Sequence, residues 1–458
     1  MIENDAFKLL LINLFHLNPD DIANILCTTF NKMMVLLVTL ADKHQACPYC
    51  GFTAPKIKEY VTKEITHSAL TTQKCIIKYR ARRYKCPCCG KTYYEFNPFV
   101  FKSQKISILT VHNILKDLKD FNETFTSVAR RYHVSPTSVS TIFDNHVDIG
   151  RNPLPEIINF DEVYAFKSEK SKYVCVLLDF KKQIPVDVLP NRKKEYLLNY
   201  FQKIPLEERK KVKYACSDMY EVYRDVVHKV FPCSCMLLDY FHLSQDFHRK
   251  MNEVRIKVMK GYKDNKASDE YYLLKKFNWL LFKNPEDEDK YGRLFDVERE
   301  RKYNSHFKSY MNYYDLRKKL LEINNDLTIC YSLKLELVDF YSKSTIDNAK
   351  VNLENLIRSC IDTNIDEMIA FSNNLINWKQ EIINSFTIVD TEYKVEADKG
   401  QVVVCNKKVN NAIIENRNKI IKCIKNNANG YTNWSRFRNR VMYVLDPNTT
   451  FSLEPREK

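Results

Sequence analysis

The sequence predicts a multidomain α+β protein in which small N-terminal modules precede an α/β domain and a following stretch of long helices. Its 458 residues suffice for about three domains of roughly 150 residues each, and 45% are hydrophobic, so global disorder is excluded. Strand-like and helix-like segments alternate over residues 156–240, as in an α/β domain. No proline lies between Pro285 and Pro447, which predicts long helices there.

Composition narrows the classes of function. Lys and Arg number 72 against 57 Asp and Glu, and the net charge of +15 favours a polyanionic partner, nucleic acid before an anionic membrane surface. The longest apolar run is far shorter than the roughly 20 residues of a membrane span, and Glu3 and Asp5 stand where a signal peptide would be basic. We therefore expect a soluble, cytoplasmic protein. Neither glycine-rich phosphate-binding motif occurs, which excludes dinucleotide enzymes and P-loop ATPases.

The first two modules are a helical segment and a metal-binding module. Residues 1–43 are mostly apolar with helical spacing, and residues 44–103 hold two copies of the sequence CPxCG. Each copy places two thiolates on one side of a tight loop, and its glycine lets the backbone turn beneath a metal ion. The pair predicts a zinc ribbon; four buried thiols without metal are the alternative. The expected ligands of a structural Zn²⁺ are Cys47, Cys50, Cys86 and Cys89.

A basic stretch from Lys74 to Lys85 lies between the two cysteine pairs, contains no acid and is interleaved with Tyr79 and Tyr84. Such a stretch can follow DNA phosphates, whereas the alternative is a solvated strand face. The candidate DNA contacts are Arg80, Arg82 and Arg83.

Residues 104–150 predict a helix-turn-helix DNA-binding domain. Two short helices, 126–132 and 135–143, flank a tight turn, with Ser135 as N-cap and Pro136 at the first helical position of the second. An ordinary helical hairpin is the alternative. The candidates for contact with the major groove or with phosphates are Ser138, Thr141, Arg130 and Arg131.

Residues 151–248 predict the first part of a catalytic α/β domain. The expected order is β-β-β-α-β-α-β, which is the ribonuclease-H-like order. Asp161 lies in the first strand and Asp218 directly follows the fourth. Because these strands are neighbours in that fold, both carboxylates should meet at one edge of the sheet and hold Mg²⁺ (or Mn²⁺). The alternative for either Asp is a cap or turn residue.

Several segments together resemble bacterial insertion-sequence transposases of the DDE type, specifically the ISL family. The resemblance is carried from about residue 44 onward by the CPxCG pairs, residues 82–86, 159–162, 217–220 and 238–242, and the tail from Gly430 to Arg440.

The resemblance implies a zinc ribbon, a helix-turn-helix and a catalytic domain whose halves flank an all-α insertion. We place that insertion at 249–400, the second catalytic part at 401–447 and a frayed tail at 448–458. It also implies a family position at Asp239 and His242, which either assist near the metal or serve a structural role.

Glu415 is the expected third metal ligand, with Glu396 and Asp239 as substitutes. The surrounding residues predict a helix packed on a sheet, in which Asn418 lies on the face of the carboxylate. The family shows Glu followed three residues later by Asn, and usually glycines beside the Glu, where this chain has Asn411 and Asn416. A surface Glu paired with Lys419 is the alternative. Lys419 and Lys422 are expected beside bound DNA.

The predicted function is that of a transposase that binds the terminal inverted repeats of its element on double-stranded DNA. Cleavage and strand transfer would use Asp161, Asp218 and Glu415, with Zn²⁺ structural, in a homodimer or larger synaptic assembly near the bacterial nucleoid. Two rivals are a non-catalytic or domesticated DNA-binding regulator and an RNA-processing nuclease of the same fold.

Overall fold

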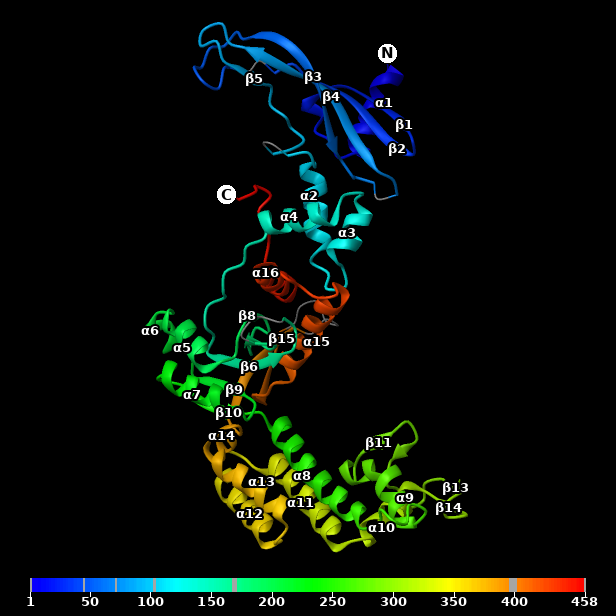
Figure 1. Cartoon of the computed structure of the whole chain (residues 1–458). Helices are drawn as coiled ribbons and strands as arrows, with labels where there is room; N and C mark the ends of the chain where they lie inside the picture. Colours follow the sequence, from blue (N-terminus) through cyan, green and yellow to red (C-terminus); the bar gives the residue numbers. More distant parts are fainter. Residues whose placement is uncertain are drawn as a thin grey trace.

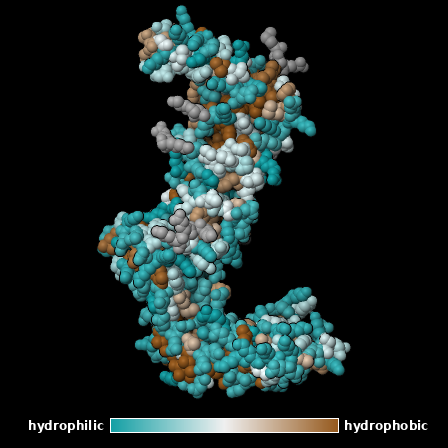
Figure 2. Space-filling view, viewed as in Figure 1, coloured by the Kyte–Doolittle hydropathy of each residue, from teal (hydrophilic) through white to brown (hydrophobic). Residues whose placement is uncertain are grey.

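The computed structural model describes residues 2–43, 46–70, 72–101, 104–166, 171–394 and 402–456 of the chain. It is a mixed α+β protein of several parts arranged along an elongated molecule (Figure 1). In the described part of the chain no helix is long and apolar enough to cross a bilayer. The surface is mainly hydrophilic, with apolar patches that include one on the N-terminal part (Figure 2).

The N-terminal part is a five-stranded sheet with one helix beside it, not a helical segment. The strand order is β1-β2-β4-β3, with β5 paired to β4. Its elements are α1 (Ile2–Leu14), β1 (Ile22–Phe30), β2 (Met33–Leu40), β3 (Lys56–Thr66), β4 (Cys75–Lys85) and β5 (Thr92–Tyr94). The prediction of helix for 1–43 is therefore correct only for α1. Asn31 and Lys32 adopt positive φ, which forms the two-residue turn of a hairpin, and short apolar runs do not distinguish strand from helix by spacing.

Three short helices follow: α2 (Ile108–Asp117), α3 (Phe125–Arg131) and α4 (Pro136–His146). The predicted cap is confirmed, because the Ser135 hydroxyl accepts a hydrogen bond from the Ser138 N–H at 3.0 Å and Pro136 opens α4. Val128, Val139 and Phe143 are fully buried between the helices.

The central sheet has five strands in the order β10-β9-β6-β7-β8. β6 pairs antiparallel with β7 and parallel with β9, so the first and fourth strands are neighbours, as predicted. The order of elements is the predicted one with one additional short helix, α6. The elements are β6 (Ile157–Val163), β7 (Val174–Asp179), β8 (Pro185–Leu189), α5 (Lys194–Gln202), α6 (Leu206–Arg209), β9 (Tyr214–Ser217), α7 (Glu221–Val230) and β10 (Cys235–Leu238).

The segment after the sheet is mostly helical, but the prediction of an all-α insertion over 249–400 is wrong in three places. Two small hairpins, β11–β12 (288–293) and β13–β14 (302–311), project from it, and β15 (Ile388–Lys394) pairs with β16 (Val402–Lys408). The strands of the two small hairpins have only two or three residues and are too short to show an alternating pattern. The helices are α8 (Tyr240–Lys260), α9 (Asp269–Lys276), α10 (Tyr313–Glu322), α11 (Asn325–Lys343), α12 (Ala349–Asp362), α13 (Asp366–Asn377) and α14 (Lys379–Asn384).

The last two helices, α15 (Ala412–Asn427) and α16 (Trp434–Leu445), return to the central sheet and join it to the three-helix part. One buried apolar cluster contains side chains of α2, α3, α4, β7, α15 and α16. The tail predicted to be frayed is instead attached to α4: the His146 Nδ1 lies 2.7 Å from the Ser452 carbonyl oxygen, and Arg456 pairs with Asp148 at 2.9 Å.

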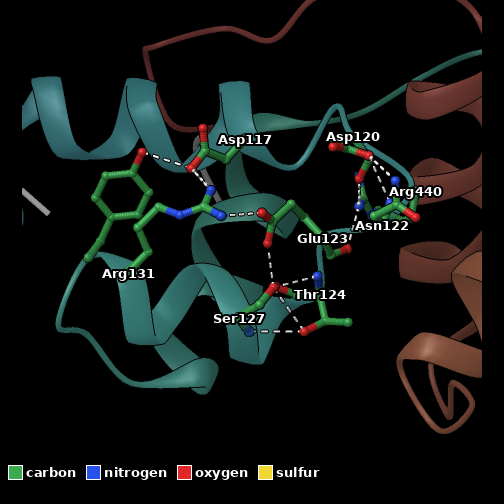
Figure 3. A network of polar contacts seen from close by, with 9 residues as sticks. Asp117, Asp120, Asn122, Glu123, Thr124, Ser127, Arg131 and Arg440 are labelled. Atoms are coloured by element: carbon green, nitrogen blue, oxygen red, sulfur yellow. Dashed lines mark hydrogen bonds and ion pairs between the residues drawn. The ribbon is translucent and has the colours of Figure 1, made fainter.

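Arg440 of α16 is the largest fully buried side chain of the described residues and bridges these two parts. Its guanidinium donates hydrogen bonds to the carbonyl oxygens of Asp120 and Glu123, both at 2.8 Å (Figure 3). The Tyr443 hydroxyl makes a parallel connection to the Leu115 carbonyl at 2.9 Å. The loop between α2 and α3 is thereby attached to α16, which packs on the central sheet.

We expect Arg440→Met to destabilise the protein by about 2–4 kcal/mol, because the carbonyl groups of Asp120 and Glu123 both lose the charged donor that the buried guanidinium supplies. Urea unfolding measures this change. The control is Arg456→Ala, whose exposed ion pair with Asp148 should contribute less than about 1 kcal/mol. Equal stability of the two variants would contradict a bridging role for Arg440.

Candidate active site and metal-binding clusters

The four cysteines of the CPxCG pairs come together at one end of the β3–β4 ribbon. The Cys47 and Cys89 sulfurs lie 3.7 Å apart and those of Cys50 and Cys86 lie 3.5 Å apart, with all four within 4.8 Å of one another. A tetrahedral Zn²⁺ with Zn–S bonds of about 2.3 Å requires sulfurs roughly 3.8 Å apart. The Cys₄ cluster therefore has the composition and size of a zinc site.

The backbone at each cysteine pair is that of a metal-binding loop. Gly51 and Gly90 adopt φ of +72° and +70°, a conformation that side chains with a Cβ rarely take. Their N–H groups donate to the carbonyls of Cys47 and Cys86, both at 2.9 Å. The Cys89 N–H, donating to the Cys86 sulfur, lowers the pKa of that thiol to about 7, whereas desolvation and the neighbouring thiols raise the pKa values of Cys50 and Cys89.

The basic strand β4 is largely neutralised by acids of neighbouring strands. Arg82 pairs with Glu95 at 2.8 Å, and Arg83 pairs with Glu59 at 2.6 Å. Arg82 is also nearly buried and donates to the Leu40 carbonyl, so its side chain is occupied within the protein. Arg80 remains exposed, with its guanidinium 4.8 Å from the Tyr60 ring centroid.

The predicted DNA contacts of the helix-turn-helix also include exposed residues and one residue that is paired within the protein. Arg130 and Thr141 are exposed on α3 and α4, and the Ser138 hydroxyl lies 2.8 Å from that of Ser135. Arg131 instead forms ion pairs with Asp117 and Glu123 within the three-helix part (Figure 3). Of the two arginines, Arg130 is the more exposed, and the half-buried Arg131 is engaged in two ion pairs.

The first two predicted catalytic carboxylates lie at the same edge of the central sheet. Asp161 lies in β6 and is 9% exposed, and Asp218 directly follows β9, the parallel neighbour of β6. One oxygen of Asp161 accepts a hydrogen bond from the Asn418 amide at 2.7 Å, and the other accepts one from the Glu162 N–H at 2.7 Å. One oxygen of Asp218 is buried without a hydrogen-bond partner.

Burial is the main electrostatic influence on these carboxylates. Burial, and secondarily the charge of Asp218, raise the pKa of Asp161 to about 7. Burial also raises the pKa of Asp218, although the charges of His242 and Arg192 oppose this effect. Paired carboxylates that resist ionisation until a cation neutralises them are typical of functional sites.

Glu415 lies in the first turn of α15 and faces Asp239 and His242. One ligand atom from each of the three residues lies within 4.8 Å of the others. The start of α15 is attached to β6 by Asn411, whose amide accepts from Asn159 at 2.7 Å and donates to the Phe160 carbonyl at 3.2 Å. Asn411 thus holds the start of this helix in place. Glu396, the other proposed substitute, lies outside the described residues.

Arg192 is a site residue that sequence reasoning missed. Its guanidinium pairs with Glu162 and lies 4.9 Å from the Tyr220 ring centroid and 4.6 Å from that of Tyr173. No motif surrounds it, and its place beside the carboxylates depends on the fold of the β8–α5 loop.

Lys419 and Lys422 are exposed on α15, and the Lys419 ammonium lies 3.2 Å from the Asn416 amide oxygen.

Oxygen donors of buried carboxylates suit a hard divalent cation. Unpartnered buried atoms at this edge of the sheet include an oxygen of Asp218, an oxygen of Asp239 and Nε2 of His242. Buried polar atoms are ordinarily hydrogen-bonded, and bound cations would satisfy these. The donor set therefore fits Mg²⁺ or Mn²⁺.

Two comparisons with known proteins bear on the site. A family model described as a transposase, the ISL3 type of DDE transposases, matches residues 158–397, a span that includes Asp161, Asp218, Asp239 and His242 and ends before Glu415. The transposase for insertion sequence element IS1001 of Bordetella parapertussis is 19% identical over 408 residues, which cover 89% of this chain and 90% of that protein.

Proposed function

The chain belongs to the ISL3-type family of DDE transposases, since more than half of it matches the family, and we propose that it cleaves and joins DNA at the terminal inverted repeats of its own element. The observation that carries this proposal is the meeting of Asp161 and Asp218 at one sheet edge, with an oxygen of Asp218 buried and unpartnered. We assign the central sheet to a ribonuclease-H-like catalytic domain and the Cys₄ module to a zinc ribbon.

The proposed reaction is a phosphoryl transfer in two steps. Water attacks the phosphorus at the element end, the bond from phosphorus to the 3′ oxygen breaks, and a free 3′-OH remains. That 3′-OH then attacks a phosphorus of target DNA and displaces the 3′ oxygen of the target strand. Divalent cations held by Asp161, Asp218 and Glu415 would stabilise the charge that develops on the phosphoryl oxygens.

The protein's own residues orient this site. Asn418 holds the Asp161 carboxylate through the 2.7 Å hydrogen bond, so α15 positions both Glu415 and the first aspartate. Glu162 holds Arg192 at the edge of the site, where its positive charge opposes the rise in the pKa of Asp218 that burial causes. We propose that the guanidinium contacts a phosphate flanking the reacting one.

The proposed DNA contacts are exposed side chains, most of them basic. Joining two element ends calls for a dimer or a larger synaptic assembly. A non-catalytic regulator is not favoured, because a DNA-binding module alone has no use for the buried unpartnered carboxylates of Asp218 and Asp239. The contacts proposed from the exposed side chains are Arg80, Arg130, Thr141, Lys419 and Lys422.

Purified protein incubated with end-labelled DNA tests the proposal. With Mg²⁺ we expect nicking at the ends of DNA that carries the inverted repeats, and no such nicking of scrambled DNA. Cleavage of RNA or of a hybrid without preference for the repeats would instead favour an RNA-processing nuclease. Binding without cleavage at any divalent cation would favour a regulator.

The affinity for element ends should fall steeply with salt, because each neutralised phosphate contributes about −0.9 to the slope of log affinity against log salt. If Arg130 contacts a phosphate, Arg130→Ala should reduce the magnitude of the slope by about one unit. Lys343→Ala, an exposed substitution in the insertion, is the control and should leave the slope unchanged. Fluorescence anisotropy at several salt concentrations measures it; a slope near zero in the unmodified protein would contradict an extended basic surface.

A further inference from the structure

We propose that Asp239, His242 and Glu415 form a second divalent-cation site, distinct from the Asp161–Asp218 pair, in which an imidazole nitrogen is one ligand. The inference deepens the proposed function and rests on it for the use of the cation. It assigns Glu415 to the Asp239–His242 side of the active site and makes the two cation positions chemically unlike.

The fold brings the three residues together from two distant elements. Asp239 directly precedes α8 and His242 follows three residues later, so both side chains lie on one face of the first turn. Glu415 comes from the first turn of α15, more than 170 positions along the chain. Their ligand atoms lie within 4.8 Å of one another, which is the spacing of donors around one ion.

Two of the three side chains in this cluster have a buried atom without a hydrogen-bond partner. Asp239 is 2% exposed, yet one of its carboxylate oxygens accepts no hydrogen bond, and the buried Nε2 of His242 has no hydrogen-bond partner either. These two atoms are 3.8 Å apart, which is too long for a hydrogen bond between them. Leaving both unsatisfied is costly, whereas one cation between them would satisfy both.

The donor set determines which ion the site prefers. Mg²⁺ takes oxygen ligands almost exclusively, which matches Asp161 and Asp218, whereas imidazole suits transition metals. The Asp239–His242–Glu415 site should therefore bind Mn²⁺ in preference to Mg²⁺. The thiolates of the Cys₄ cluster favour zinc and do not compete for manganese.

Mn²⁺ binding to the untagged full chain, which carries one equivalent of Zn²⁺ for the Cys₄ cluster, tests the inference by electron paramagnetic resonance. Electron spin-echo modulation from a directly bound ¹⁴N should be present in the unmodified protein and absent in His242→Gln, whose affinity for one Mn²⁺ should fall by about tenfold or more. His228→Gln, at an exposed histidine of α7, should keep the modulation. Asp161→Asn should weaken cation binding by the Asp161–Asp218 pair and should also keep the nitrogen modulation.

Two results would overturn the inference: no nitrogen modulation in the unmodified protein, which would leave Asp239 and His242 as an ordinary ion pair, or modulation that persists in His242→Gln. If His242→Gln does not fold by circular dichroism, Asp239→Asn replaces it, with a tenfold loss of Mn²⁺ affinity expected. Failure of the proposed second cation site can be distinguished from failure of the proposed function. DNA cleavage with Mg²⁺ but without nitrogen modulation contradicts only this inference, and modulation without cleavage contradicts only the proposed function.

Discussion

Glu415→Gln should lower Mg²⁺-dependent cleavage of element ends by about a thousandfold or more while leaving binding to those ends intact. Glutamine preserves the size of the side chain and removes the charge, so α15 should remain in place. Asn411 and Asn418, which attach this helix to β6, are not altered by the change. The loss would therefore report the missing cation ligand and not a displaced helix.

The matched control is Glu207→Gln, an exposed acid on α6 whose only described partner is Lys210. It should cleave at the rate of the unmodified protein. Gel-resolved cleavage of labelled ends under single-turnover conditions, with binding measured in parallel, separates the two properties. Substantial cleavage by Glu415→Gln would move the third ligand elsewhere, with Asp239 the first candidate.

Cys86→Ser should abolish zinc binding and disorder the cysteine-bearing end of the β3–β4 ribbon. The apolar cluster there consists of Cys47, Tyr84, Cys86, Cys89 and Tyr93, which is too few residues to hold the loops together without metal. Zinc binding of this kind contributes on the order of 10 kcal/mol to the folding of small zinc modules. The other end of the ribbon has its own core, and the catalytic half is separate, so both should stay folded.

Zinc content measured by mass spectrometry and hydrogen exchange of the ribbon amides check this expectation. Cys88→Ser is the control, because Cys88 is exposed and lies outside the Cys₄ cluster. We expect about one zinc per chain in the control and none in Cys86→Ser. A full complement of zinc in Cys86→Ser would show that the metal is held by other residues.

The parts of the fold with a strong local signal were predictable. Ser135 and Pro136 predicted the start of α4, and the order of strands predicted that Asp161 and Asp218 would meet, because parallel neighbours end at the same edge. The β1–β2 hairpin was not predicted, since its apolar residues fit either period. Its signal was the Asn31–Lys32 turn, which needs two positive φ angles.

Contacts between segments distant in sequence were beyond local reasoning. Arg82 is predicted as a phosphate contact because no acid lies near it in the stretch, yet Glu95, which directly follows β5, pairs with it. Arg192 had no motif to mark it. Asn418, in contrast, has a sequence signal. Its spacing of three residues from Glu415 places both on one face of α15, and in the structure Asn418 on that face contacts Asp161.

Asp161 is the proposed cation ligand on which DNA cleavage depends most directly. The direct measurement is cleavage of labelled element ends by the unmodified protein and by Asp161→Ala, each with and without Mg²⁺. Cleavage should occur only in the unmodified protein with Mg²⁺, and both proteins should bind the ends. Cleavage by Asp161→Ala at a comparable rate, or cleavage by the unmodified protein without any divalent cation, would contradict the claim.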